Sequence, residues 1–203
     1  MNRLVIIGAS GHGRVVADIV QKLNNYSEIV FLDDGEITES MGIPVVGKVA
    51  DVDKYLCDSD IFVAIGNCQV RETLINRLLL TNAFIPTLIH PNATVGASVE
   101  LGAGTVVMAG AVINPCTKIG KGVIINTCSS VDHDCLIGDC VHIAVGAHLA
   151  GAVCIGEKTW VGAGATVSNN VSICASCMIG AGAVVIKDIA ESGTYIGVPA
   201  KRK

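Results

Sequence analysis

The feature that most constrains the fold of this chain is an aliphatic side chain that recurs at every sixth position through its second half. The series begins at Ile89, ends at Val185 and contains only isoleucine, leucine and valine. A six-residue period fits neither the turn of an α-helix nor the alternation of a β-strand, but one short strand and one corner per six residues would produce it. The repeat therefore predicts a stacked, prism-shaped parallel β-helix.

The residues between the aliphatic positions fit the corners and the interior of such a prism. Glycine often follows the aliphatic residue, and the fourth residue after it is small or β-branched in most repeats, as at Ala93, Thr105 and Ala165. We expect glycine to relieve the corner and the small side chain to fill the interior beside the aliphatic one. This hexapeptide pattern resembles that of left-handed parallel β-helices, from which we take the left hand, since parallel crossovers are otherwise right-handed.

The composition argues against several classes of partner. The chain has 203 residues, a formal net charge of −4 and no stretch of 18 consecutive apolar residues, so we expect neither a nucleic-acid nor a membrane partner. The chain runs from its start directly into a strand-like segment without a signal-peptide pattern, which favours a cytoplasmic location.

Nine cysteines are scattered along the chain, and the one CxxC pair is formed by Cys174 and Cys177. No βαβ pattern surrounds this pair, and Cys177 stands at an interior position of the repeat. We therefore expect the pair to pack in the core and not to act in redox chemistry.

The first part of the chain carries a different pattern, that of an α/β domain. Its elements alternate, with strand-like segments at 4–7, 29–32 and 61–65 and helical patterns at 15–23 and 71–80. The first strand, helix and second strand form a βαβ unit. We therefore expect two domains, a Rossmann-like α/β domain over 1–85 and a β-helix over 86–203.

Polar turns follow all three predicted strands. They are the glycine-rich turn Gly8–Gly13, the pair Asp33 and Asp34, and the turn Gly66–Asn67. In an open parallel sheet these carboxyl ends share the edge at which ligands bind, with backbone N–H groups suited to phosphate and carboxylates suited to a ribose or a base. Because the glycine spacing is GxxGxG and not GxGxxG, the sequence favours a mononucleotide-linked ligand over NAD.

Together these motifs resemble those of the bacterial sugar O- and N-acyltransferases, typified by UDP-4-amino-sugar N-acetyltransferases of bacillosamine synthesis and by sialic acid O-acetyltransferases. The motifs are Gly8–Gly13, Asp33-Asp34, Ala64–Asn67, Leu88–Pro91, Asn126–His133, Val145–Ala147 and Ile196–Lys201. The resemblance covers nearly the whole chain. It implies transfer of acetyl from acetyl-CoA to the 4-amino group of a nucleotide-linked, UDP-type amino sugar for bacterial glycan biosynthesis, with no metal.

The resemblance also implies which residues bind the two substrates. The positions that match the nucleotide-sugar site, with Asn67 beside them, are Ser10, Gly11, His12, Asp33, Asp34, Gly66 and Asn67. Acetyl-CoA would lie along the β-helix between neighbouring subunits, at the positions His142, Gly151, Ala163 and Ala181.

His133 matches the general base of these enzymes. Transfer to an amine requires a group of near-neutral pKa that removes a proton as nitrogen attacks the thioester. Asp134 stands where the related amino-sugar enzymes have a glutamate that orients the imidazole, and Asp132 is a second candidate for that role.

The spacing of two histidines bears on the assembly. His133 and His142 are half an 18-residue coil apart and so fall on different parts of the prism, which means that a site shared between them needs two chains. We therefore expect a homotrimer with active sites between subunits. Three alternatives stay open: O-acetylation of sialic acid or another sugar, a GDP- or dTDP-linked acceptor, and a zinc lyase of the γ-carbonic-anhydrase type that uses His133, His142 and His148.

Overall fold

The computed structural model describes residues 3–203, so that Met1 and Asn2, the first two residues of the predicted α/β domain, lie outside it. The chain divides into two compact units with their boundary between Pro91 and Asn92. None of the helices within residues 3–203 combines the length and the apolar character that crossing a bilayer requires.

The first unit is built on a five-stranded sheet. Its strands, in spatial order, are β3 (Glu39–Ser40), β4 (Ile43–Gly47), β2 (Glu28–Leu32), β1 (Arg3–Ile7) and β5 (Ser59–Val63). All neighbours run parallel except β3 and β4, which form an antiparallel pair. Strands β1, β2 and β5 confirm the three predicted strands. The β3–β4 hairpin was not predicted, because β4 contains Pro44 and alternates between buried and exposed residues instead of forming an apolar run.

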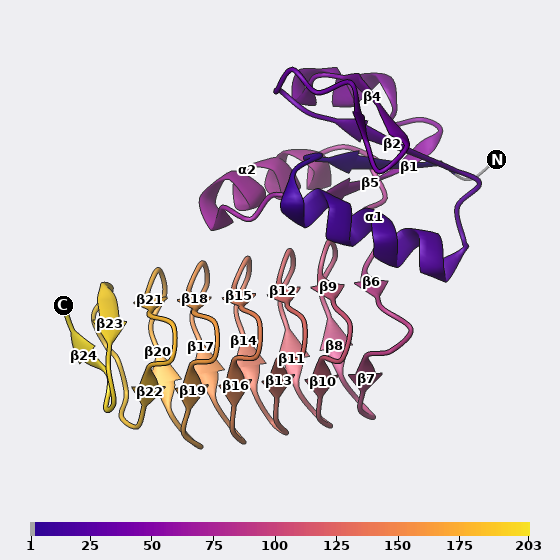
Figure 1. The fold of residues 1–203 in the computed structure, drawn as a ribbon. Coiled ribbons are helices and arrows are strands. Elements are labelled where there is room, and N and C mark those ends of the chain that lie inside the picture. Colours follow the sequence, from indigo (N-terminus) through magenta and orange to yellow (C-terminus); the bar gives the residue numbers. More distant parts are fainter. Residues whose placement is uncertain (1–2) are drawn as a thin grey trace. The chain divides into compact units, whose positions relative to one another are not determined.

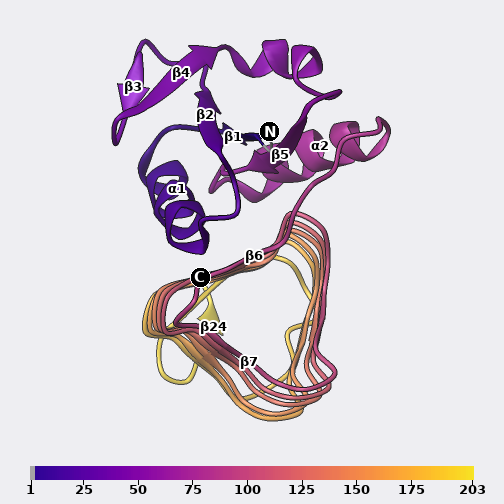
Figure 2. The ribbon, with the colours of Figure 1, turned by 90° about the vertical axis from the view of Figure 1, so that its right-hand side faces the viewer.

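Three helices accompany this sheet: α1 (Gly11–Leu23), the 3₁₀ helix η1 (Val49–Lys54) and α2 (Cys68–Leu79). Figures 1 and 2 show α1 and α2 on one side of the sheet and η1 on the other. Helix α1 begins four residues before the predicted start at Val15, because the last residues of the glycine-rich turn form its first turn. At Gly13 a Cβ would collide with the carbonyl oxygen of Gly8, so glycine lets the helix start against the loop. The short strand β6 (Leu88–Ile89) ends the unit.

The second unit is the predicted left-handed parallel β-helix (Figure 2). Its first sheet contains β7 (Thr94–Val95), β10 (Val112–Ile113), β13 (Ser130–Val131), β16 (His148–Leu149), β19 (Thr166–Val167) and β22 (Val184–Val185). Its second sheet contains β8 (Glu100–Leu101), β11 (Lys118–Ile119), β14 (Leu136–Ile137), β17 (Cys154–Ile155) and β20 (Ser172–Ile173). Its third sheet contains β9 (Val106–Val107), β12 (Ile124–Ile125), β15 (His142–Ile143), β18 (Trp160–Val161), β21 (Met178–Ile179), β23 (Thr194–Ile196) and β24 (Lys201–Arg202).

Successive coils stack in a fixed register. In the first sheet Val112 pairs with Ser130, and Ser130 pairs with His148, so each residue lies beside the residue 18 positions along the chain. Each strand of this sheet has two residues, and the aliphatic one points inward. Ile113, Val131 and Leu149 are at most 2% exposed. The core of the β-helix is therefore a set of stacked aliphatic rows.

Two positions of the repeat have different roles at the corners: the residue with a left-handed backbone and the glycine that follows the aliphatic residue. A left-handed backbone occurs at every sixth residue from Ser98 to Gly182, two positions after the glycine that we expected to relieve the corner. That expected glycine serves another purpose, since a Cβ on Gly138 would lie 2.6 Å from the backbone nitrogen of Glu157 in the next coil. Close stacking of coils, and not backbone conformation, therefore requires glycine there.

Candidate active site

The turns after β1, β2 and β5 meet at one edge of the parallel sheet. Gly8 donates its N–H to the carbonyl of Leu32 at 2.8 Å, and Ala64 donates to the carbonyl of Ile7 at 2.8 Å. The residues assigned to the nucleotide sugar all lie in these turns or at the helix starts that follow them: Ser10, Gly11, His12, Asp33, Asp34, Gly66 and Asn67. The structure thus brings this whole set to one end of one sheet, next to the N-terminus of α1, where N–H groups can hold a phosphate.

The two aspartates shape this edge. The Asp33 carboxylate accepts the N–H of Ala9 and that of Gly35, each at 2.7 Å, and so ties the glycine-rich turn to the turn after β2. Asp34 accepts the N–H of Val49 at 2.9 Å and thereby fixes the start of η1. Because a carboxylate accepts about four hydrogen bonds, both can still take a ligand donor while they hold the backbone.

A buried arginine that the sequence analysis missed organises the third turn. Arg71 is 1% exposed, and its guanidinium donates to the carbonyls of Ile65 and Gly66 at 2.8 and 2.9 Å. Burial, and then the Arg71 cation, lower the pKa of His12 to about 4, so its imidazole is neutral at physiological pH. His12 Nε2 is buried and has no hydrogen-bond partner among the described residues, which leaves this nitrogen for a ligand atom.

Two glycines at this edge have no role within the chain itself. Gly11 and Gly66 lie outside the left-handed region, and a Cβ on either would meet no atom within 4 Å. Neither backbone conformation nor packing therefore explains glycine at these positions. We therefore expect a ligand to approach the backbone closely at both positions.

In the β-helix, His133 stands on the corner that follows β13. The Asp132 carboxylate accepts the N–H of His133 at 2.8 Å and the side-chain amide of Asn114 at 2.6 Å. His133 Nδ1 lies 2.8 Å from a carboxylate oxygen of Asp134. Asp134 has a φ of 60°, a left-handed conformation that aspartate tolerates better than most residues. The side chain that is one methylene shorter than glutamate thus reaches the imidazole.

This geometry changes the proton affinity of the imidazole. The hydrogen bond that His133 donates to Asp134, and next the charge of Asp132, raise the pKa of His133. The amide of Asn114 and the N–H of His133 lower the pKa of Asp132, so that this carboxylate is charged. A carboxylate on Nδ1 favours the tautomer in which Nδ1 carries the proton and Nε2 is the acceptor. The side chain of His133 is 59% exposed, so a substrate can reach it.

Gly151 lies one coil beyond His133, and the imidazole occupies the space above it. A Cβ on Gly151 would lie 2.7 Å from both Nε2 and Cε1 of His133. The absence of a side chain at Gly151 therefore sets where the imidazole can lie.

The other positions assigned to acetyl-CoA lie elsewhere on the prism. Ala163 and Ala181 are exposed and occupy the corners that lead from the third sheet into the first. His133 and Gly151 occupy the corners at the opposite edge of the first sheet. His142 is on the third sheet, where its ring centroid lies 4.2 Å from that of Trp160. Within one chain the structure thus brings His133 and Gly151 together and Ala163 near Ala181, but does not join the two groups.

The three histidines considered for zinc do not converge within one chain. His142 contacts the amide of Asn126 at 3.0 Å, and His148 contacts the hydroxyl of Ser130 at 2.9 Å on a different sheet from His142. Over residues 3–203, no group of three or more histidine, cysteine, aspartate or glutamate side chains is placed to hold a metal ion.

The CxxC pair lies in the last coils of the β-helix. The sulfur atoms of Cys174 and Cys177 are 3.5 Å apart, and Cys177 is buried in the interior. Burial and the hydrogen bond with Cys174 raise the pKa of Cys177 to about 11. A thiol of such high pKa is a poor nucleophile, which agrees with the expected packing role.

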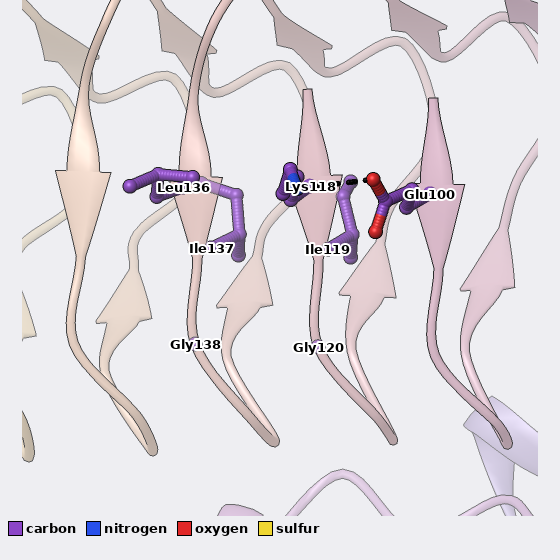
Figure 3. A pocket seen from close by; sticks show the side chains of 7 residues that line it. All are labelled: Glu100, Lys118, Ile119, Gly120, Leu136, Ile137 and Gly138. Carbon is purple, nitrogen blue, oxygen red and sulfur yellow. Dashed lines mark ion pairs between the residues drawn. The ribbon is translucent and has the colours of Figure 1, made fainter. Parts of the chain in front are cut away.

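A shallow hollow of about 320 Å³ lies on the outer face of the second sheet (Figure 3). Glu100 and Lys118 form an ion pair of 3.1 Å at one side of it, and the half-exposed Leu136 lies at the other. None of the residues assigned to either substrate lines this hollow.

Comparisons with known proteins show what this chain is similar to. The model of the PglD N-terminal domain matches residues 3–78. The chain is 37% identical over 113 residues to UDP-N-acetylbacillosamine N-acetyltransferase of Bacillus subtilis, a match that spans 54% of this chain and 52% of that relative.

Solved structures match over nearly the full length. The acetyltransferase domain of PglB from Neisseria gonorrhoeae, in complex with acetyl coenzyme A, has a TM-score of 0.97 and 42% identity, with 99% of this chain and 98% of that chain covered. PerB from Caulobacter crescentus, in complex with CoA and GDP-perosamine, has a TM-score of 0.91 and 39% identity, with 98% and 96% covered.

The fold and the two sites define a class, that of β-helical acyltransferases with an added α/β domain for a nucleotide-linked acceptor. Within that class, the chain belongs to the PglD-type family of bacterial sugar N-acetyltransferases, which confirms the resemblance seen in the sequence.

The Asp134–His133 contact predicts the pH dependence of the reaction. His133 must be neutral to accept a proton, so kcat/KM should fall as the pH drops through its raised pKa. Asp134→Asn removes the carboxylate whose hydrogen bond, and to a smaller extent its charge, raise this pKa, so the acidic limb should move to lower pH and the plateau rate should fall. A pH–rate profile over about pH 5–9 measures both effects, and an acidic limb at the same pH in both proteins would contradict the assignment.

Because a Cβ on Gly11 or Gly66 would meet no atom of the chain, substitutions there should weaken nucleotide binding without lowering folding stability. Gly11→Ala and Gly66→Ala should each weaken binding of a nucleoside diphosphate about tenfold, or about 1.4 kcal/mol, with no loss of folding stability. Gly13→Ala is the matched control and should lower the unfolding midpoint, because its Cβ collides with the Gly8 carbonyl. Calorimetric titration and thermal unfolding test both statements. Unchanged binding in both Gly11→Ala and Gly66→Ala would show that this edge of the sheet is not the nucleotide site.

Proposed function

We propose that this chain transfers acetyl from acetyl-CoA to the 4-amino group of a UDP-linked amino-dideoxy sugar, with His133 as general base. The single observation that carries the proposal is the corner at which Asp134 holds Nδ1 of an exposed imidazole at 2.8 Å. Relatives with this fold bind acetyl coenzyme A, or CoA together with GDP-perosamine. The UDP assignment rests on the Bacillus relative, which is named for a UDP-linked sugar.

The chemistry follows from this geometry. As the amine nitrogen attacks the thioester carbonyl, Nε2 of His133 takes its proton, and the Asp134 carboxylate stabilises the imidazolium that forms. A backbone N–H of the β-helix wall steadies the oxyanion of the tetrahedral intermediate. The C–S bond then breaks and the CoA thiolate leaves, with the proton on the imidazole available to it. No covalent acyl-enzyme is required.

We propose further that the active enzyme is a homotrimer with its sites between subunits. The division of the assigned residues between two edges of the first sheet supports this, because two copies side by side could join the His133 corner of one to the Ala163 corner of the other. A cytoplasmic location fits a reaction that uses acetyl-CoA and a nucleotide sugar.

The direct test of the proposal measures CoA release with a panel of acceptors. We expect turnover with a UDP-4-amino-4,6-dideoxy sugar and loss of about 10²- to 10⁴-fold in kcat for His133→Ala, with acetyl-CoA affinity and oligomeric state retained. Turnover with GDP-4-amino-4,6-dideoxymannose alone would correct the nucleotide, and turnover with free sialic acid alone would correct the acceptor. Full activity of His133→Ala would refute the role of the base, and loss of activity on treatment with a chelator would favour zinc chemistry.

A further inference from the structure

Three fully buried threonines inside the β-helix make the same unusual contact. Thr105, Thr117 and Thr159 are each 0% exposed and occupy the small interior position of the repeat. Each hydroxyl donates a hydrogen bond to a carbonyl of the next coil and accepts one from an N–H of that coil. The carbonyl and the N–H belong to residues at the two ends of one corner. Thr105 bonds Gly120 O at 2.8 Å and Val123 N at 3.1 Å, Thr117 bonds Asp132 O at 2.7 Å and Cys135 N at 3.2 Å, and Thr159 bonds Cys174 O at 2.9 Å and Cys177 N at 3.1 Å.

Corners at the edge between the third and first sheets are closed in another way, by a direct backbone bond. At the corner from Asn126 to Ser129, the N–H of Ser129 bonds directly to the carbonyl of Asn126 at 3.1 Å. At the corner from Ala144 to Ala147, the equivalent bond is 3.0 Å. The Thr117 hydroxyl bonds to both of the corresponding groups at the His133 corner, and so bridges a carbonyl and an N–H that do not bond to each other directly.

The bridged corner is the one that carries the base. His133 and Asp134 are the two middle residues between the carbonyl of Asp132 and the N–H of Cys135. The outer side of this corner is fixed separately, because the Asp132 carboxylate holds the N–H of His133. Thr117 therefore controls, from the interior, the backbone on which the imidazole and its carboxylate partner both stand.

We propose that Thr117 is a positioning residue for the general base, whose hydroxyl holds both ends of the Asp132–Cys135 corner from the interior and so aligns the Asp134 carboxylate with the His133 imidazole. This inference rests on the proposed role of His133. Without the hydroxyl, the carbonyl of Asp132 and the N–H of Cys135 would both lose their bonding partner inside the β-helix. The backbone of the two intervening residues would then shift to recover hydrogen bonds.

The chain supplies a matched control in Thr105. Thr117→Val and Thr105→Val each replace a threonine hydroxyl with a methyl group of similar size. Both residues occupy the same position of the repeat, and each variant loses one bond to a carbonyl and one from an N–H. We expect similar losses of thermal stability in both variants. We expect kcat to fall about tenfold or more in Thr117→Val alone, with KM for acetyl-CoA within about twofold of the parent value, and Thr117→Ser to retain kcat. If either valine variant fails to fold, Thr117→Ala and Thr105→Ala replace the pair.

A second readout is independent of turnover. The carboxylates that face the His133 imidazole are Asp132 and Asp134, and a misaligned Asp134 would lower the imidazole pKa. Titration of His133 by NMR should show this decrease in Thr117→Val and none in Thr105→Val. Equal kcat and equal imidazole pKa in the two variants would overturn the inference. Should His133→Ala prove active, the proposed function would fall, while the titration would still decide whether Thr117 positions the imidazole.

Discussion

The stacking of coils in a strict register is the constraint on which the rest of this structure depends. Because each residue lies beside the one 18 positions along, a side chain on one corner is surrounded by the same corner of the coils before and after it. Gly151 meets the His133 imidazole in this way, and Asn114 meets Asp132, whose carboxylate accepts the His133 N–H. The His133 corner is therefore a property of the stack, and no single hexapeptide could form it.

The fold was predictable because its signals are local in the sequence. An aliphatic residue at every sixth position forces the prism, and the polar turns after three strands placed the nucleotide-sugar residues at one sheet edge. The neighbours His133 and Asp134 could be paired for the same reason. The contacts of Thr117 and Gly151 with the His133 corner could not be predicted, since a separation of 15 to 18 residues means contact only once the register is known. Arg71 was missed because an arginine in an amphipathic helix is usually exposed, whereas this one is buried against two carbonyls.

The same register keeps apart the two groups of residues that we assign to the β-helix site. The first sheet separates the corner of His133 and Gly151 from the corner of Ala163 and Ala181, and the straight prism gives no means of bending one edge toward the other. We therefore propose that the imidazole of one subunit acts on acetyl-CoA held by the next.

Co-expression of two inactive variants tests that claim most directly. His133→Ala removes the base, and Ala163→Arg blocks the opposite corner, so each variant alone should be inactive. If trimers assemble at random from equal amounts of the two variants, about one site in four of the whole population would combine an intact His133 corner with an intact Ala163 corner, and activity should return to about a quarter of the parent value. Mixed trimers that stay inactive would contradict the account, because they would place the whole site within a single chain.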